Sequence, residues 1–450
     1  MVARMHKFFR INFSNLEERN AFYLSVEVIW AAVLIAAQSF FVPYAVRLGA
    51  TNFEIGLFNS IPALLTIFLS IPVGKFLERQ NNSLGWTLGG MTVNRLGFLF
   101  LALVPLVNHP NISKGTLVII ILIVLNLPDL LYKIGQWPFI MRLVPEDRRI
   151  SVFTNRSLLT LIVTGVGVFL FGQWLNETQY PSNFQVMTIL AVAVSQLSLL
   201  FWLKVKLPEF ETGITSNHAI TSTTQSSTTE IFRLINFRTD YGRVILNQIF
   251  TYIGIWTATP LYVLYTVRDL GASDYWIGLQ VTVNSFAAII GWMLARRLTS
   301  KWGEPQALKR CSQLVTLYPF LMGISPTLTP ILFASALNSI VSPIFSLSHN
   351  NNLLRAIPFG SEHNGIALYN TLFSIGGFIC PIIGVSLAGI FGTRPMLIGS
   401  GIISLIGSLS FHIWPVFYPS NNNRVIGGIN KYTKLILNFM SNVIGWLHRR

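Results

Sequence analysis

Four polar or charged side chains lie inside a long apolar segment, in the stretch "NLPDLLYKIGQ" at residues 126–136. Asn126, Asp129, Lys133 and Gln136 are three or four residues apart, which places them on one face of a helix. Charges inside a membrane are costly, and they usually face a cavity or another charge. An aspartate there is a candidate proton carrier, because its access and its cationic partner control its protonation. The alternative, that Asp129 and Lys133 neutralise each other only to permit insertion, stays open.

Two further charged residues, Glu27 and Arg95, lie well inside other apolar segments of the first half. We predict that Glu27 is a second proton-coupling candidate, and that Arg95 and Lys133 are the charge partners of the two carboxylates. Glu27 lies nearer the predicted cytoplasmic end, which also favours a gate or snorkelling role. For Arg95, binding an anionic solute group competes with bracing a carboxylate. The second half has no Asp, Glu, Lys or Arg at comparable depth.

The composition indicates a membrane protein. Hydrophobic residues make up 52% of the 450 and charged residues only 11%, against about 25% charged in soluble domains. Windows of about 20 apolar residues recur along the chain, each long enough to cross the hydrocarbon core as a helix. We therefore predict an all-α polytopic membrane protein with 12 transmembrane helices. A proline at position 128, beside Asp129, predicts a kink in the fourth helix.

The distribution of the net charge of +15 indicates how the chain is oriented in the membrane and does not indicate nucleic-acid binding. Of the 32 Lys and Arg residues, 26 fall in segments on one side of the predicted spans and 4 on the other. This asymmetry is a strong positive-inside signal. We expect both termini to be cytoplasmic and the protein to lie in a plasma (inner) membrane.

An internal repeat divides the chain into two halves. Residues 48–57 read "LGATNFEIGL" and residues 270–279 read "LGASDYWIGL", with six identical positions at an offset of 222. Two further markers agree in order: "RLVP" at 142–145 matches "RAIP" at 355–358, and Asn155 matches Asn370. Such a series predicts two pseudo-symmetric six-helix lobes.

Composition sets the remaining boundaries. A Ser/Thr-rich central segment predicts a flexible linker, and apolar residues at spacings of three or four near the C-terminus predict an amphipathic helix. The predicted organisation is a cytoplasmic N-terminal arm at 1–21, a first lobe at 22–203, a linker at 204–243, a second lobe at 244–417 and a cytoplasmic tail at 418–450.

The loop after the second predicted helix reads "GKFLERQNN", and together with the two matching halves it resembles the major facilitator superfamily. Gly74, Glu78 and Arg79 match the loop signature of that family, with glutamate in place of aspartate. The resemblance implies the fold of that family and a gate role for these three residues. It also implies that the first, fourth, seventh and tenth helices line a central cavity.

Polar and aromatic residues on those helices and on the eighth are the predicted cavity or substrate residues. They are Gln38, Asn126, Gln136, Trp137, Gln248, Tyr252, Trp256, Gln280, Asn284, Asn338, Ser342 and His349. For the aromatic residues, stacking on a solute competes with packing or an interfacial belt.

The sequence lacks enzyme signatures such as a phosphate-binding glycine loop or clustered metal ligands. We expect no enzymatic activity, no cofactor, no metal and no nucleic-acid partner, and we expect a monomer in the lipid bilayer. The predicted function is proton-coupled secondary transport of a small molecule by alternating access. The alternatives are an uncoupled facilitator or anion exchanger anchored by Arg95 and Lys133, and a non-transporting sensor or lipid-interacting protein.

Overall fold

The computed structural model describes residues 16–107, 110–144, 146–205, 239–357 and 362–415. These residues are almost entirely helical and contain no strand. A helix satisfies its own backbone hydrogen bonds, which lipid cannot do. The centre of the predicted linker, the predicted tail helix and most of the N-terminal arm lie outside these ranges.

The first half of the chain consists of helices that follow one another through short connections. They are α2 (Leu16–Arg47), α3 (Asn52–Glu78), α4 (Ser83–Gly97), α5 (Leu99–Leu103), η1 (Val104–Leu106), α6 (Lys114–Val124), α7 (Asn126–Leu143), α8 (Glu146–Glu177) and α9 (Ser182–Lys204). The stretch from α6 to α7 is one span interrupted at Leu125. Pro128 has no N–H to donate to the carbonyl of Val124, which accounts for this interruption. The kink predicted in the fourth helix stays a prediction.

The second half repeats this arrangement. It consists of α11 (Asp240–Val263), the π-helical turn η2 (Leu264–Asp269), α12 (Asp274–Trp302), α13 (Glu304–Ile324), α14 (Leu328–Ala356), α15 (Glu362–Phe391) and α16 (Thr393–Ile413). The described residues include 10 helical stretches that are long and apolar enough to cross a membrane. Helices α11 and α13 fall outside that set, so the total of 12 spans stays a prediction.

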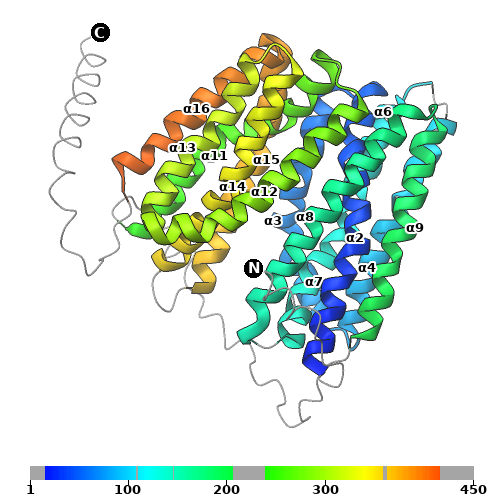
Figure 1. The fold of residues 1–450 in the computed structure, drawn as a ribbon, viewed down its shortest axis with the longest axis horizontal. Helices are drawn as coiled ribbons and strands as arrows, with labels where there is room; N and C mark the ends of the chain where they lie inside the picture. Colours follow the sequence, from blue (N-terminus) through cyan, green and yellow to red (C-terminus); the bar gives the residue numbers. More distant parts are fainter. Residues whose placement is uncertain (1–15, 108–109, 145, 206–238, 358–361, 416–450) are drawn as a thin grey trace.

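The helices form two bundles that lie side by side (Figure 1). In the first, α2 packs on α8 and α9, and α4 packs on α7. In the second, α11 packs on α15 and α16, and α14 packs on α12 and α13. Two helix pairs form the largest contacts between the bundles, α8 with α12 and α3 with α15. The two pairs are equivalent under the internal repeat, because α3 corresponds to α12 and α8 corresponds to α15.

The repeated segment starts the second helix of each half, and its shared residues have matching roles. Gly49 and Gly271 adopt positive φ values of 89° and 65° in the preceding turn, where a side chain would be strained. Thr51 and Ser273 cap α3 and α12, each accepting a hydrogen bond of 3.2 Å from the backbone N–H three residues ahead. The repeat therefore encodes the same turn and the same helix start twice.

The last shared glycine of each repeat lies where helices of the two halves cross. A Cβ on Gly56 of α3 would lie 2.5 Å from the Val385 side chain of α15. A Cβ on Gly278 of α12 would lie 2.9 Å from the Val168 carbonyl of α8, and Gly172 of α8 is restricted in the same way. Small residues allow helix backbones to approach closely, so these glycines set the distance between the halves.

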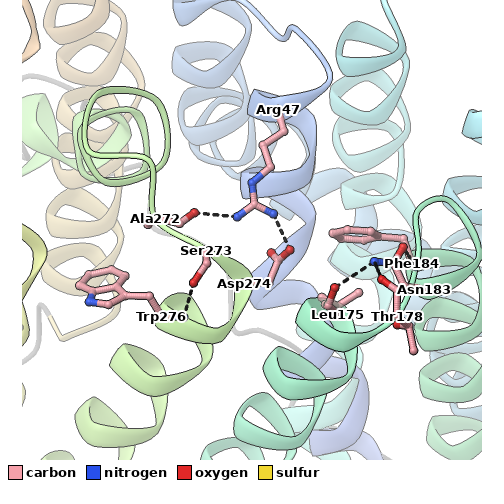
Figure 2. A network of polar contacts seen from close by, with 9 residues as sticks. All are labelled: Arg47, Leu175, Thr178, Asn183, Phe184, Ala272, Ser273, Asp274 and Trp276. Carbon is pink, nitrogen blue, oxygen red and sulfur yellow. Dashed lines mark hydrogen bonds and ion pairs between the residues drawn. The ribbon is translucent and has the colours of Figure 1, made fainter.

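Two arginines join the halves at the same end, and we call Arg47, Arg268 and their partners the arginine clamp. Arg47, the last residue of α2, donates to the Asp274 carboxylate at 2.5 Å and to the Ala272 carbonyl at 2.8 Å (Figure 2). Asp274 is the first residue of α12, where a carboxylate is also stabilised by the helix dipole. The bond therefore connects the end of α2 in the first half to the start of α12 in the second half.

Arg268 makes the reciprocal contacts. It donates to the Asn52 side chain and, at 2.6 Å, to the Ala50 carbonyl. Ala50 and Asn52 are the repeat counterparts, 222 residues earlier, of Ala272 and Asp274. Arg268 lies in the π-helical turn η2, whose wider winding changes which side chains share a face. We call this end of the molecule the closed end.

The glycine crossing predicts that Gly278→Val separates α8 from α12 and opens the closed end. The reporter is a cysteine introduced by Gln280→Cys in a protein whose two native cysteines, both buried, are replaced by serine. The measurement is the rate at which a membrane-impermeant maleimide labels this cysteine. We expect labelling from the closed-end side to be faster in the Gly278→Val protein. Gly389→Val in α15, where a Cβ has open space, is the matched control; equal rates for both variants would contradict the prediction.

The clamp predicts a separate effect in the same reporter protein. Arg47→Gln removes a partly buried ion pair worth about 1 kcal/mol, so labelling of Gln280→Cys from the closed-end side rises about fivefold. Asp274→Asn, which keeps an acceptor as Asn52 does, has a smaller effect. Arg394→Gln is the control, because Arg394 donates to Gly323 and Ile324 within its own half. No difference between Arg47→Gln and Arg394→Gln would rule out the clamp as a closing contact.

Candidate functional site

The predicted charged residues line one cavity in the first half. Its volume is about 570 Å³, and it is surrounded by α2, α4, α6, α7 and α8 with Phe58 of α3. The charged residues that line it are Glu27, Arg95, Asp129, Lys133 and Arg156. The four predicted charges are therefore brought together, and a fifth joins them.

Glu27 is paired with Arg156, a residue for which we predicted no role. Arg156 Nη2 lies 2.7 Å from Glu27 Oε1, and the Arg156 guanidinium also donates to the Leu24 carbonyl. The side chains are only 1% and 13% exposed for Glu27 and Arg156, which contradicts a snorkelling role for Glu27. Arg156 is one of the 26 basic residues that the sequence assigns to one side of the predicted spans, but α8 begins at Glu146 and carries Arg156 into the bundle.

Arg95 does not form the predicted pair with either carboxylate. Its side chain is buried at the end of α4, where Nη1 donates to the Ser195 carbonyl at 2.5 Å and to the Ser198 hydroxyl. Both partners are on α9, which packs on α4. The prediction of Arg95 as a carboxylate partner is therefore wrong for direct contact, because Arg156 already occupies that position beside Glu27.

Asp129 and Lys133 form the predicted pair, with Nζ 2.6 Å from Oδ2. The Lys133 side chain is 60% exposed and that of Asp129 is 26% exposed, so this pair is more open than Glu27–Arg156. The cavity therefore opens beside Lys133. Asn126 also lines the cavity, and its amide donates to the Leu122 carbonyl at 2.9 Å, bridging the break at Leu125.

A second cavity of about 280 Å³ lies between the two halves. Gln38 and Gln280, both predicted cavity residues, face it from α2 and α12. Tyr262 and Tyr318 line its other side, with ring centroids 5.0 Å apart. Gln38 and Phe58 line both cavities, so the two spaces are adjacent and lead from the first-half charges toward the closed end.

The predicted residues of the second half form an aromatic cluster instead of a charged site. Tyr252 and Trp256 lie 5.3 Å apart, and Trp256 meets Phe373 edge-on at 4.5 Å. His349 is buried and lies 3.0 Å from the Tyr369 hydroxyl. The sequence did not single out Phe373 or Tyr369, because an aromatic residue in an apolar helix carries no distinguishing signal. Packing therefore accounts for the contacts of Tyr252 and Trp256.

The other predicted residues lie outside the linings of these two cavities. Gln248 is buried in α11, whereas the following are half-buried: Gln136, Asn284, Asn338 and Ser342. Trp137 belongs to α7, and its side chain is outside the described part of the structure.

The three predicted gate residues lie at the end of α3. Helix α3 ends at Glu78, and Arg79 caps it. The side chains of Glu78 and Arg79 are exposed, and Gly74 has open space where a Cβ would lie. In the described ranges, neither Glu78 nor Arg79 forms an ion pair, so the gate role stays a prediction.

The different burial of the two ion pairs predicts different stability losses. Arg156→Gln leaves the Glu27 carboxylate buried without its cation, which costs about 3 kcal/mol or more. Lys133→Gln breaks an exposed pair worth less than about 1 kcal/mol. Thermal unfolding in detergent should therefore show a much lower midpoint for Arg156→Gln. The double variant Glu27→Gln/Arg156→Gln should recover most of the loss, and equal midpoints for the two single variants would contradict this.

Comparison with known proteins gives one sequence match. Residues 244–442 match the family model described as Major Facilitator Superfamily. No curated protein matches the chain. The match includes the whole predicted second lobe, residues 244–417. The internal repeat relates that lobe to the first.

Solved structures share the fold over most of the chain. The nucleoside transporter NupG has a TM-score of 0.62 at 12% identity, covering 89% of this chain and 100% of its own. A POT family transporter in complex with a thioalcohol conjugated peptide has a TM-score of 0.64 at 13% identity, covering 87% and 95%. A variant of the E. coli fucose:proton symporter FucP has a TM-score of 0.53 at 17% identity, covering 86% and 97%. These similarities confirm the predicted fold.

Proposed function

We propose that this multi-pass membrane protein, whose second half matches the Major Facilitator Superfamily model, is a secondary transporter of that family that moves a small solute by alternating access. The observation that carries the proposal is a charged cavity that leads to a clamped interface between two repeat-related halves. The cavity is open beside Lys133, and the path toward the other end is closed by Arg47 and Arg268. Such an arrangement suits a site that is reached from one side at a time.

The predicted topology gives the direction of this opening. It places the repeated segments on the outer face, so the closed end faces outward and the cavity is reached from the cytoplasm. Rocking of the halves about the glycine crossings would close the cytoplasmic side and release the clamp. A partly buried ion pair of moderate strength suits a gate that must open and close reversibly.

Glu27 is the residue we propose to carry the coupling proton. Its Oε1 atom forms an ion pair with Arg156 at 2.7 Å, and its Oε2 atom is buried without a hydrogen-bond partner among the described residues. Helix α8 carries Arg156 and also packs against α12 of the other half. A shift of α8 during rocking would draw Arg156 from Glu27 and favour protonation of the carboxylate. Asp129 remains a second candidate, although its pair with Lys133 is more exposed.

The structural neighbours support this class of function. FucP is described as a fucose:proton symporter, and NupG as a nucleoside transporter. Their different solutes show that the shared fold by itself selects no substrate.

The proton proposal predicts the behaviour of Glu27→Gln in proteoliposomes. With a solute found by ligand-dependent thermal stabilisation, the wild type should accumulate it under an imposed pH gradient. Glu27→Gln should abolish that accumulation but keep solute exchange, because the amide cannot release a proton. Asp129→Asn should reduce accumulation less.

Two outcomes would contradict the proposal in different ways. Unchanged accumulation by Glu27→Gln would remove this residue from proton coupling. Solute binding without any flux in the wild type would favour the non-transporting alternative, and flux without dependence on pH would favour the uncoupled facilitator.

A further inference from the structure

We propose that the first-half cavity binds a small organic monoanion, with a carboxylate group of the solute held by Arg95 and its apolar body against the phenylalanines of the wall. The inference rests on the proposed transport function and names the substrate class of the same site. It follows from the charges of the cavity, the free edge of the Arg95 guanidinium and the apolar lining.

The charges that line the cavity do not balance. Arg95, Lys133 and Arg156 supply three cations, and Glu27 and Asp129 supply two carboxylates. Each carboxylate already holds another cation, Glu27 with Arg156 at 2.7 Å and Asp129 with Lys133 at 2.6 Å. Among the described residues, Arg95 is therefore the one lining charge without an ion-pair partner, and the lining has a net charge of one positive unit.

The polar contacts of Arg95 leave part of its guanidinium available. Both hydrogen bonds run from Nη1, to the Ser195 carbonyl and the Ser198 hydroxyl, which are neutral. Neither Nη2 nor Nε donates to a residue in the ranges that the structure describes. The bonds to Ser195 and Ser198 fix the orientation of the guanidinium. The remaining N–H groups, on Nη2 and Nε, form the planar fork that matches a carboxylate.

The burial of Arg95 makes an anionic ligand favourable. The residue is 6% exposed, and a charge held away from water without a counter-charge is costly. A bound carboxylate would supply the missing counter-charge beside a guanidinium with little access to water, where the attraction is stronger than in bulk water. A cationic solute would have to displace Arg156 or Lys133, both of which are fixed to their carboxylates. A neutral solute would leave Arg95 uncompensated.

The remaining wall determines the body of the solute. Phe41 and Phe98 stack at 5.5 Å, and Phe58 and Met91 add further apolar surface. The volume of about 570 Å³ lies in the range of small-molecule sites. The cavity therefore suits an amphipathic acid with one carboxylate rather than a polyanion or a sugar.

The first test compares matched compounds on the full chain in detergent at fixed pH and salt. The probes are isovalerate, isovaleramide and isoamylamine, and phenylacetate, phenylacetamide and phenethylamine. We expect the acids to raise the thermal unfolding midpoint more than the amide and amine of the same body. Equal stabilisation by acid and amide in both sets, or none by either acid, overturns the proposal.

The second test assigns the preference to Arg95. Arg95→Gln should raise the acid concentration needed for half-maximal stabilisation by at least about tenfold. Arg95→Lys keeps the charge and should retain a weaker preference for acids, which separates loss of binding from loss of folding. Lys133→Gln removes a charge from the same cavity and should have a smaller effect. A loss as large in Lys133→Gln as in Arg95→Gln would overturn the assignment to Arg95.

Flux in proteoliposomes distinguishes the inference from the proposed function. Stabilisation by acids that depends on Arg95, without flux of any of them, supports the binding site and contradicts transport. Flux of a neutral or cationic solute, without a preference for acids, supports transport and overturns the monoanion proposal.

Discussion

The structure depends on one contact region, the closed end, where the two copies of the repeated segment meet the opposite halves. Each copy supplies a carbonyl and a side-chain oxygen to an arginine of the other half, at Ala272 and Asp274 for Arg47, and at Ala50 and Asn52 for Arg268. Each copy also supplies a glycine where helices cross. The polar bonds orient the halves, and the glycines let them approach closely enough for those bonds to form.

The two sites of the clamp are similar but not equal. Asp274 provides a full charge at the start of α12, whereas Asn52 provides a neutral acceptor at the start of α3. A guanidinium paired with a carboxylate is held more strongly than a guanidinium that donates to a neutral amide oxygen. The ion pair makes the Arg47 side of the closed end the stronger of the two sites.

The two halves differ more in their interiors than at the clamp. The first half concentrates the charges in one cavity, and the corresponding region of the second half is filled by aromatic rings around Trp256 and Phe373. Ring packing is suited to a rigid wall, because stacked and edge-on contacts restrict rearrangement. The charged cavity offers groups that can exchange partners. In the proposed mechanism, one half responds to the solute and the proton, and the other provides the surface against which it moves.

Local sequence determined the helices, the repeat and the candidate charges. Apolar runs of membrane length can only be helices in lipid, a proline at position 128 predicts the break beside Leu125, and an i, i+4 spacing brings Lys133 to Asp129. Tertiary structure decided which charges meet across helices. Arg156 reaches Glu27 because α8 packs on α2, and Arg95 turns to α9 instead. Such pairings depend on how helices distant in sequence are rotated and placed, and no local spacing contains that information.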